Sequence, residues 1–260
     1  MEWLPPQSAT LGWLVLCRVA PLVWWSPLFG GAWLPPSTKL ALCLALSAAL
    51  WPSAWAHAPT SWADPLPAST LFLASFQEIL LGSALALVIS QTFWAVELAG
   101  GLLDRSAALS DASSAPDGEA RPPFAAWLAP LTVALFVGAG GLPLVVAALA
   151  RSWRAWPPLD AAAPLDLALL ERWALGGVEV LALGLALAFP GIAARWMAEW
   201  GLALAQRAAP RLAELLSQAS LRAAWVLLVV TASLWGIVEL ALSRAWASAS
   251  LWEDLLRGAP

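Results

Sequence analysis

The chain has 260 residues, of which 61% are hydrophobic and only 12% are charged. Soluble domains carry about 25% charged and roughly 45–50% apolar residues, so a soluble core of this size cannot enclose so much apolar surface. The net charge of −4 also excludes a nucleic-acid partner, since no basic stripe is available to neutralise phosphates. We therefore expect an all-α integral membrane protein.

Six apolar stretches are long enough to cross a hydrocarbon core of about 30 Å, which takes about 20 helical residues. We predict a polytopic protein with about six spans, forming a single membrane domain over residues 1–260. Arginine and lysine are distributed nearly equally between the two sides, so they do not predict the orientation. The predicted spans are residues 11–33, 38–56, 71–103, 124–150, 173–200 and 221–246.

Several of these stretches are irregular. Pro21 and Pro27 interrupt the first and favour a kink, because proline removes a backbone donor. Glycines and a proline within residues 138–143 interrupt the fourth, and Pro190-Gly191 interrupts the fifth. The third would be about 50 Å long as one helix, well beyond the hydrocarbon core. Broken backbone at membrane depth is tolerated inside protein or beside water, so we expect these helices to pack against other protein.

Seven charged residues fall within or at the edges of the apolar stretches. A charge at the bilayer centre costs about 2.5–3.5 kcal/mol, so most of them should face protein, water or one another. Some could be structural pairs near segment ends, and others could line a polar path or contact partner subunits. An ion pair between Arg18 and Glu78 would offset part of the desolvation cost. The seven residues are Arg18, Glu78, Glu97, Glu179, Arg195, Glu199 and Glu239.

The sequence offers little for catalysis. It contains no HExxH, GxSxG, Walker A or dinucleotide-binding motif, so we expect no catalytic residues and no enzyme activity. Cys17 and Cys43 stand in apolar runs and are interpreted as small buried side chains. His57 is the single histidine, which excludes His-rich metal sites, and we also expect no cofactor.

A set of landmark residues occurs in a characteristic order along the chain. An arginine in the first stretch is followed by a proline, and a further proline and a lysine open the second. An acidic residue and a glycine open the third stretch, a glycine and an aspartate close it, a glycine pair lies in the fourth, and Arg-x-Ala-Pro follows the fifth. The order and spacing resemble the export-apparatus family of FliR in flagella and SctT in virulence-associated type III secretion. The positions are Arg18, Pro27, Pro35, Lys39, Glu78, Gly82, Gly100, Asp104, Gly140, Gly141, Arg207 and Pro210.

The resemblance implies an inner-membrane subunit of kinked helices, packed in a helical hetero-oligomer, with these residues in structural or gating roles. It implies partners of the SctR, SctS and SctU types, membrane lipid, and unfolded secreted proteins in a channel that the subunit helps to form and seal. After Pro210 no proline follows until Pro260, a departure that favours a virulence-type member. The alternative is a small-solute or proton-coupled secondary transporter, in which Glu78, Glu97 or Glu179 would couple protons.

Residues 105–123 are small, polar and proline-containing, and they are predicted to form a flexible loop. The resemblance implies that a loop of this subunit helps to plug the pore, and by position this loop is the candidate. An ordinary solvated linker is the alternative interpretation. The candidate plug residues are Ser110, Asp111, Ser113, Ser114, Pro116, Asp117 and Gly118.

Overall fold

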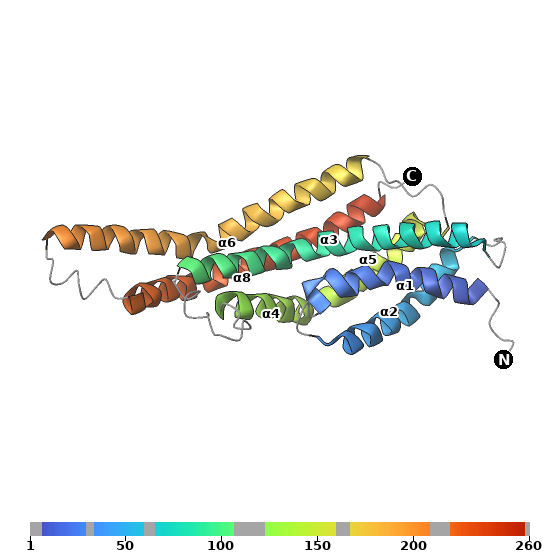
Figure 1. The fold of residues 1–260 in the computed structure, drawn as a ribbon, viewed down its shortest axis with the longest axis horizontal. Helices are drawn as coiled ribbons and strands as arrows, with labels where there is room; N and C mark the ends of the chain where they lie inside the picture. Colours follow the sequence, from blue (N-terminus) through green and yellow to red (C-terminus); the bar gives the residue numbers. More distant parts are fainter. Residues whose placement is uncertain are drawn as a thin grey trace. The chain divides into compact units, whose positions relative to one another are not determined.

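The computed structural model of the protein describes residues 7–29, 34–59, 66–106, 123–159, 167–208 and 219–257. Side chains are described for residues 8–29, 34–59, 66–106, 124–159, 175–208 and 224–247. Every regular element in the described ranges is a helix, which confirms the all-α fold (Figure 1). The elements are α1 (Gln7–Trp25), the short 3-10 helix η1 (Pro27–Phe29), α2 (Pro36–His57), α3 (Ala68–Ser106), α4 (Pro123–Gly138), α5 (Gly141–Ala155), α6 (Leu167–Ala208) and α8 (Ala219–Arg257).

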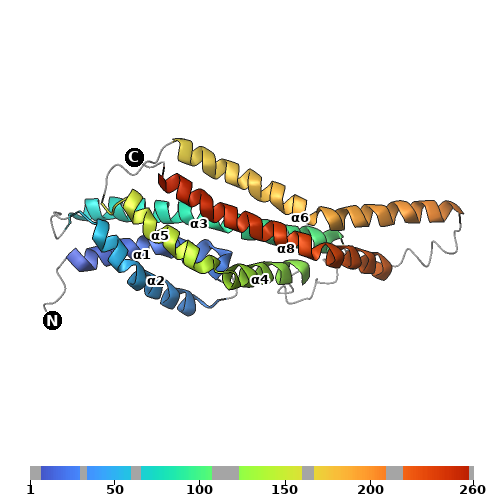
Figure 2. The same cartoon turned by 180° about the vertical axis from the view of Figure 1, so that it is seen from behind.

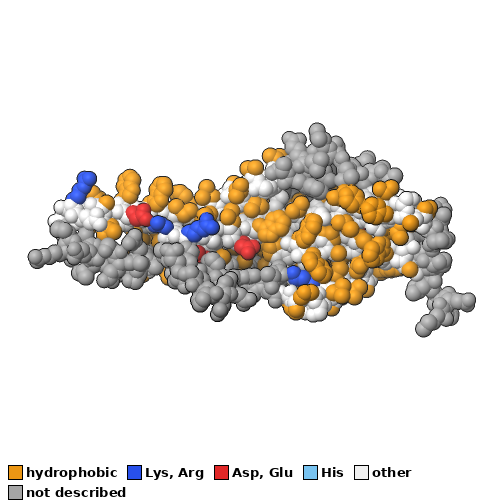
Figure 3. Space-filling view, viewed as in Figure 1, with side chains coloured by type: hydrophobic (Ala, Val, Ile, Leu, Met, Phe, Trp, Pro, Cys, Tyr) orange, Lys and Arg blue, Asp and Glu red, His pale blue; other side chains and the backbone are white. Residues whose placement is uncertain are grey.

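Within the described ranges, five helices are long and apolar enough to cross a membrane, namely α1, α2, α3, α6 and α8. A sixth crossing results if α4 and α5 together make one broken span, since the two are bent by 75° at a short break. Hydrophobic side chains cover much of the visible surface, with few charged side chains among them (Figure 3). These features confirm a polytopic membrane protein.

The break between α4 and α5 is made by glycine. Gly140 has a φ of 89°, in the left-handed region that side-chain-bearing residues rarely adopt, and its N–H donates to the carbonyl of Val137 at 3.0 Å. The next residue, Gly141, lies against the ring of Phe136, so close that a Cβ there would overlap the ring. The glycine pair therefore forms the turn at which the chain changes direction.

The prolines inside the helices do not end them. The helix α1 continues past Pro21 to Trp25, and η1 then contains Pro27. The helix α6 likewise runs without interruption through Pro190, although the sequence suggested a break there, and its ribbon changes direction partway along (Figure 1). A proline removes one backbone hydrogen bond, which the remaining turns of a long helix tolerate as a kink.

The chain groups into two compact units. Unit 1 comprises Met1–Gln91, Phe136–Gly177 and Ala245–Pro260, and unit 2 comprises Thr92–Leu135 and Val178–Arg244. In unit 1, α2 packs against both α1 and α5 (Figure 2). Only one narrow side of α2 is buried. Its buried residues recur every three or four positions, as those on one face of a helix do. Its buried residues are Lys39, Cys43, Ser47, Leu50 and Ala54.

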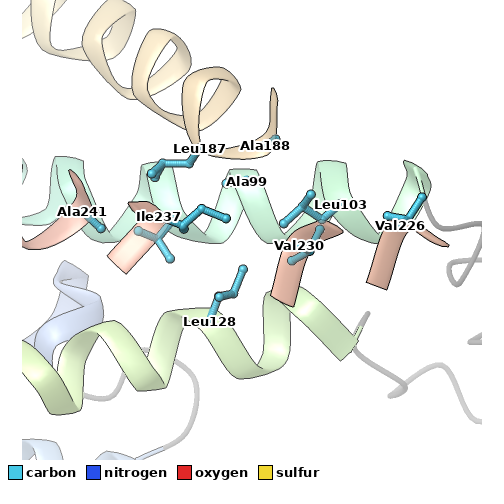
Figure 4. Packing of buried hydrophobic residues seen from close by; sticks show 10 residues of the cluster. Ala99, Leu103, Leu128, Leu187, Ala188, Val226, Val230, Ile237 and Ala241 are labelled. Carbon is cyan, nitrogen blue, oxygen red and sulfur yellow. The ribbon is translucent and has the colours of Figure 1, made fainter. Parts of the chain in front are cut away.

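Unit 2 has a core of aliphatic side chains supplied by α3, α4, α6 and α8 (Figure 4). Its members from α8 repeat at helical spacing, so one face of that helix points inward and the opposite face outward. The core residues are Val96, Ala99, Leu103, Leu128, Leu187, Ala188, Val226, Val230, Ile237 and Ala241.

Candidate functional site

A buried ion pair joins α1 to α3 in unit 1. The Nε of Arg18 donates to Oε2 of Glu78, and Nη2 of the same guanidinium donates to Oε1 at 2.9 Å. The two side chains are only 0% and 2% exposed. Two parallel charge-assisted hydrogen bonds fix the relative orientation of the two groups as well as their distance. The structure therefore places against one another the two charges that stood early in their apolar segments.

The guanidinium of Arg18 also binds α5 and the residue that follows it. Its Nη1 donates to the hydroxyl of Ser152 at 3.1 Å, and its Nη2 donates to the carbonyl of Trp156 at 3.0 Å. The ring of Trp153 lies beneath the guanidinium, 5.1 Å from its central carbon, within the range of a cation–π contact. One arginine side chain thus connects α1, α3 and the end of α5.

These contacts explain how two charges can stay buried. Taking an ion out of water costs several kcal/mol, and only good geometry with further hydrogen bonds offsets that cost. Here both carboxylate oxygens accept, and the guanidinium has acceptors from two helices. We interpret the pair as the point that fixes how α1, α3 and α5 lie against one another.

A glycine one turn after the glutamate allows this close approach. A Cβ at Gly82 would overlap the backbone carbonyl of Arg18, so any larger residue would push α1 away from α3. Because residues four apart share a face of a helix, Glu78 and Gly82 act on the same neighbour. The spacing seen in the sequence therefore corresponds to one contact surface.

A second acid and glycine pair lies near the end of α3, in unit 2. The two carboxylate oxygens of Asp104 accept from the backbone N–H groups of Phe124 and Ala125, at 2.9 and 3.0 Å. These N–H groups belong to the first turn of α4, where no intrahelical acceptor exists, so the buried aspartate caps α4 from another helix. A Cβ at Gly100 would lie 2.5 Å from the Cα of Ala125, so this glycine also permits a close backbone approach.

The other landmark residues of the first half lie at helix boundaries. Pro27 opens η1, and Pro35 precedes α2 in an extended conformation that starts the helix. Lys39 is buried in the first turns of α2, and no hydrogen bond or ion pair of its side chain is found among the described residues. None of these three contacts the Arg18–Glu78 pair through a described polar interaction.

The later landmarks are only partly within the described chain. Arg207 is exposed near the end of α6. Pro210 lies outside the described residues, and so do residues 107–122, which hold every candidate plug residue.

The remaining intramembrane charges differ in their surroundings. Arg195 and Glu199 form a half-exposed pair one turn apart on α6, at 2.8 Å. By contrast, Glu97, Glu179 and Glu239 are exposed, and the described residues supply no ion pair or hydrogen bond to their carboxylates. Two of the glutamates that a transporter would use are therefore on the surface of unit 2.

Three residues that contact the buried ion pair were not predicted from the sequence. Ser152, Trp153 and Trp156 stand where an apolar stretch gives way to a polar loop, which is an ordinary composition for the end of a membrane helix. Their role depends on contacts more than 130 positions apart along the chain. No local signal in the sequence could have identified them.

Within the described residues, no three or more His, Cys, Asp or Glu side chains are grouped as a metal site would need. Cys17 and Cys43 are free and buried, in agreement with their interpretation as small packed side chains. His57 lies at the end of α2, where its Nδ1 is 2.8 Å from the carbonyl of Ser53. The polar contacts of Arg18 and Asp104 described above join one helix to another.

Comparison with known proteins identifies the family. The family described as bacterial export proteins, family 1, matches residues 9–246. The chain is 31% identical over 151 residues to the Yop proteins translocation protein T of Yersinia pestis, an alignment that covers 56% of each chain. It is 26% identical over 159 residues to the surface presentation of antigens protein SpaR of Salmonella typhimurium, covering 60% of this chain and 57% of that protein. The matched segments thus span little more than half the length of these curated relatives. Since the family match covers nearly the whole chain, the resemblance seen in the sequence is confirmed, and the chain belongs to the bacterial export proteins, family 1.

Proposed function

We propose that the chain is a subunit of a type III protein export gate, which it helps to form and to seal around unfolded proteins in transit. The observation that carries the proposal is the family match over residues 9–246. It agrees with the five or six apolar crossings of a multi-pass protein of the bacterial inner membrane. The names of the relatives, a translocation protein and a surface presentation protein, favour the virulence-associated type.

The proposed work of the subunit is conformational and not catalytic. The buried charges Arg18 and Glu78 contact one another and neighbouring helices instead of lining an open site. Asp104 likewise binds main-chain N–H groups. Such contacts suit a wall element that must hold bent helices in a defined arrangement, and they leave no described nucleophile beside a base.

Neighbouring subunits of the SctR, SctS and SctU types are the proposed partners, as the family implies. The outward faces of α6 and α8 support this, since they carry large hydrophobic side chains that are more than half exposed. Examples are Phe189, Trp200 and Trp235, which are 64%, 75% and 79% exposed. Lipid or partner helices must cover such surfaces in a membrane.

A sealing role for residues 105–123 is also part of the proposal and rests on the resemblance. Most of this segment lies outside the described residues. Its two flanks are α3, which ends at Ser106, and α4, which begins at Pro123, and Asp104 holds them together through the first turn of α4. The contact fixes the two helix ends between which the proposed plug segment begins and ends.

The test is deletion and complementation in the bacterium that encodes the chain. Loss of the gene should abolish export of substrate proteins to the medium, measured by immunoblot, and the intact gene should restore it. The purified chain alone in liposomes should show no substrate-dependent uptake of small solutes. Unchanged export in the deletion strain, or uptake by the isolated chain, would contradict the proposal.

A further inference from the structure

Unit 2 carries carboxylates that its own helices leave uncovered. Glu97 on α3, Glu179 on α6 and Glu239 on α8 all lie within apolar spans and are exposed. Charged side chains in membrane spans almost always face protein or water, because hydrocarbon does not solvate them. The surface of unit 2 is therefore incomplete as it stands, and something that is not lipid must cover it.

Of these three residues, Glu239 lies nearest the middle of its apolar span. In the apolar part of α8, Ala224–Ala247, Glu239 is the only charged residue before Arg244. Arg244 follows five positions later, about 140° around the helix, and so does not share its face. The span therefore contains no cation that could neutralise this carboxylate from the same side.

The face that bears Glu239 is otherwise mostly apolar, and the exposed Thr231 on it donates its hydroxyl to the carbonyl of Leu227 in the same helix. Val230 and Ile237 point into the core of unit 2, whereas Leu228 and Trp235 are 60% and 79% exposed. Leu228, Trp235 and Glu239 are spaced by seven and four positions, which places them in one row along the outward side of the helix. We call this row the α8 outer face.

We propose that the α8 outer face binds a membrane helix of another gate subunit, and that this helix carries a lysine or arginine at the depth of Glu239. The inference rests on the proposed function, because it requires a neighbouring subunit. An apolar row with one carboxylate is complementary to an apolar helix with one cation, which would both cover Trp235 and neutralise the charge.

Other occupants fit this face less well. Lipid would leave the carboxylate in hydrocarbon. A water-filled path would expose the large apolar side chains of Leu228 and Trp235 to water, which is unfavourable. A second copy of the chain, docked through the same face, would place two Glu239 carboxylates together. A basic partner helix avoids all three costs.

The first experiment replaces Trp235 with the photoreactive residue p-benzoylphenylalanine in cells that carry the complete secretion system. Irradiation should give an adduct with another multi-span protein. Mass spectrometry should place the crosslinked peptide on an apolar helix with lysine or arginine within about one turn of the adduct. Adducts with lipid only, with a second copy of the chain, or with a helix lacking a basic residue would overturn the proposal.

The second experiment changes the charge and keeps the helix. Glu239→Lys should lower the amount of the crosslinked partner that co-purifies in mild detergent by about tenfold or more. When the partner's basic residue is also changed to glutamate, the amount of partner that co-purifies with Glu239→Lys should return. A misfolded variant would not allow this recovery. Glu179→Lys is the matched control, because it makes the same change in charge on α6, outside the α8 outer face, and should leave the recovery of this partner unchanged.

Equal recovery of the partner with Glu239→Lys and with the unchanged chain would overturn the inference. The deletion experiment described above keeps this failure separate from that of the proposed function. If deletion abolishes export while the partner still co-purifies in full with Glu239→Lys, the chain is a gate subunit whose α8 outer face is covered in another way.

Discussion

The two ends of α3 solve the same packing problem with different chemistry. Near its start, in unit 1, Glu78 and Gly82 stand one turn apart, and near its end, in unit 2, Gly100 and Asp104 do the same. At both places the glycine lets the backbone of another helix approach, and the acid accepts hydrogen bonds from that helix.

The difference lies in what the acid binds. Glu78 meets a full positive charge, so two ions are removed from water and each depends on the other. Asp104 meets main-chain N–H groups at the start of α4, which no substitution in α4 other than proline can remove. The comparison indicates that the first contact is the more vulnerable, because the loss of either side chain leaves a buried charge unpaired, while the second depends on one side chain.

The largest effect should come from breaking the ion pair on one side. Glu78→Ala leaves the Arg18 guanidinium buried without its carboxylate, and such a change costs about 3–5 kcal/mol. Folding should be measured by denaturation with SDS in mixed micelles, followed by tryptophan fluorescence. The double variant Arg18→Ala/Glu78→Ala should lose less stability than the sum of the two single variants, because neither charge is then left alone. Additive losses would show that the pair is not coupled.

Exchanging the two charges sharpens the same test. In Arg18→Glu/Glu78→Arg the ion pair can form again, but the new arginine on α3 would have to reach Ser152 and the Trp156 carbonyl from another helix. We therefore expect partial recovery relative to Glu78→Ala. Full recovery would mean that the contacts with α5 contribute nothing.

The glycines should give the next effect, and they should behave alike in the two units. Gly82→Ala and Gly100→Ala each place a Cβ against backbone atoms, and overpacking of this kind costs about 1–3 kcal/mol. Gly101→Ala is the matched control, because nothing lies within 4 Å of the added Cβ, and alanine should there raise helix stability slightly. The same SDS denaturation checks all three, and equal effects of Gly100→Ala and Gly101→Ala would refute the packing argument.

The sequence predicts the helices of this protein well and their contacts only in part. Apolar length is a local property, so the all-α fold and the number of crossings follow from composition alone. The paired positions on α3 were also visible, since spacing by four residues is a local pattern. The partners were not, because Asp104 binds residues about 20 positions later and Arg18 binds Trp156 across 138 positions. A bend at Pro190 without a break likewise depends on how the rest of the helix is held.

Asp104 should show a smaller effect than the residues above. Asp104→Ala removes the cap of α4 and should cost about 0.5–2 kcal/mol, the range for loss of an N-cap. Asp104→Asn keeps one acceptor oxygen and should retain part of the stability, which an effect of charge alone would not explain. Ser106→Ala, which removes only a hydrogen bond inside α3, is the control. If Asp104→Asn were as destabilising as Asp104→Ala, the hydrogen bonds to Phe124 and Ala125 would not carry the stability.

The smallest effect is expected from the half-exposed ion pair on α6. It serves as a reference for the two buried contacts, the Arg18–Glu78 pair and the Asp104 cap. Arg195 and Glu199 are 42% and 41% exposed and lie one turn apart on the same helix, so water weakens their attraction. Glu199→Gln should change the free energy of unfolding by no more than about 0.5 kcal/mol, in contrast to Glu78→Ala. The measurement is the same denaturation, repeated at low and high salt, because the small effect should shrink further as ionic strength rises. If Glu199→Gln lowered the free energy of unfolding as much as Glu78→Ala does, burial would not determine how much each ion pair contributes to the stability of this chain.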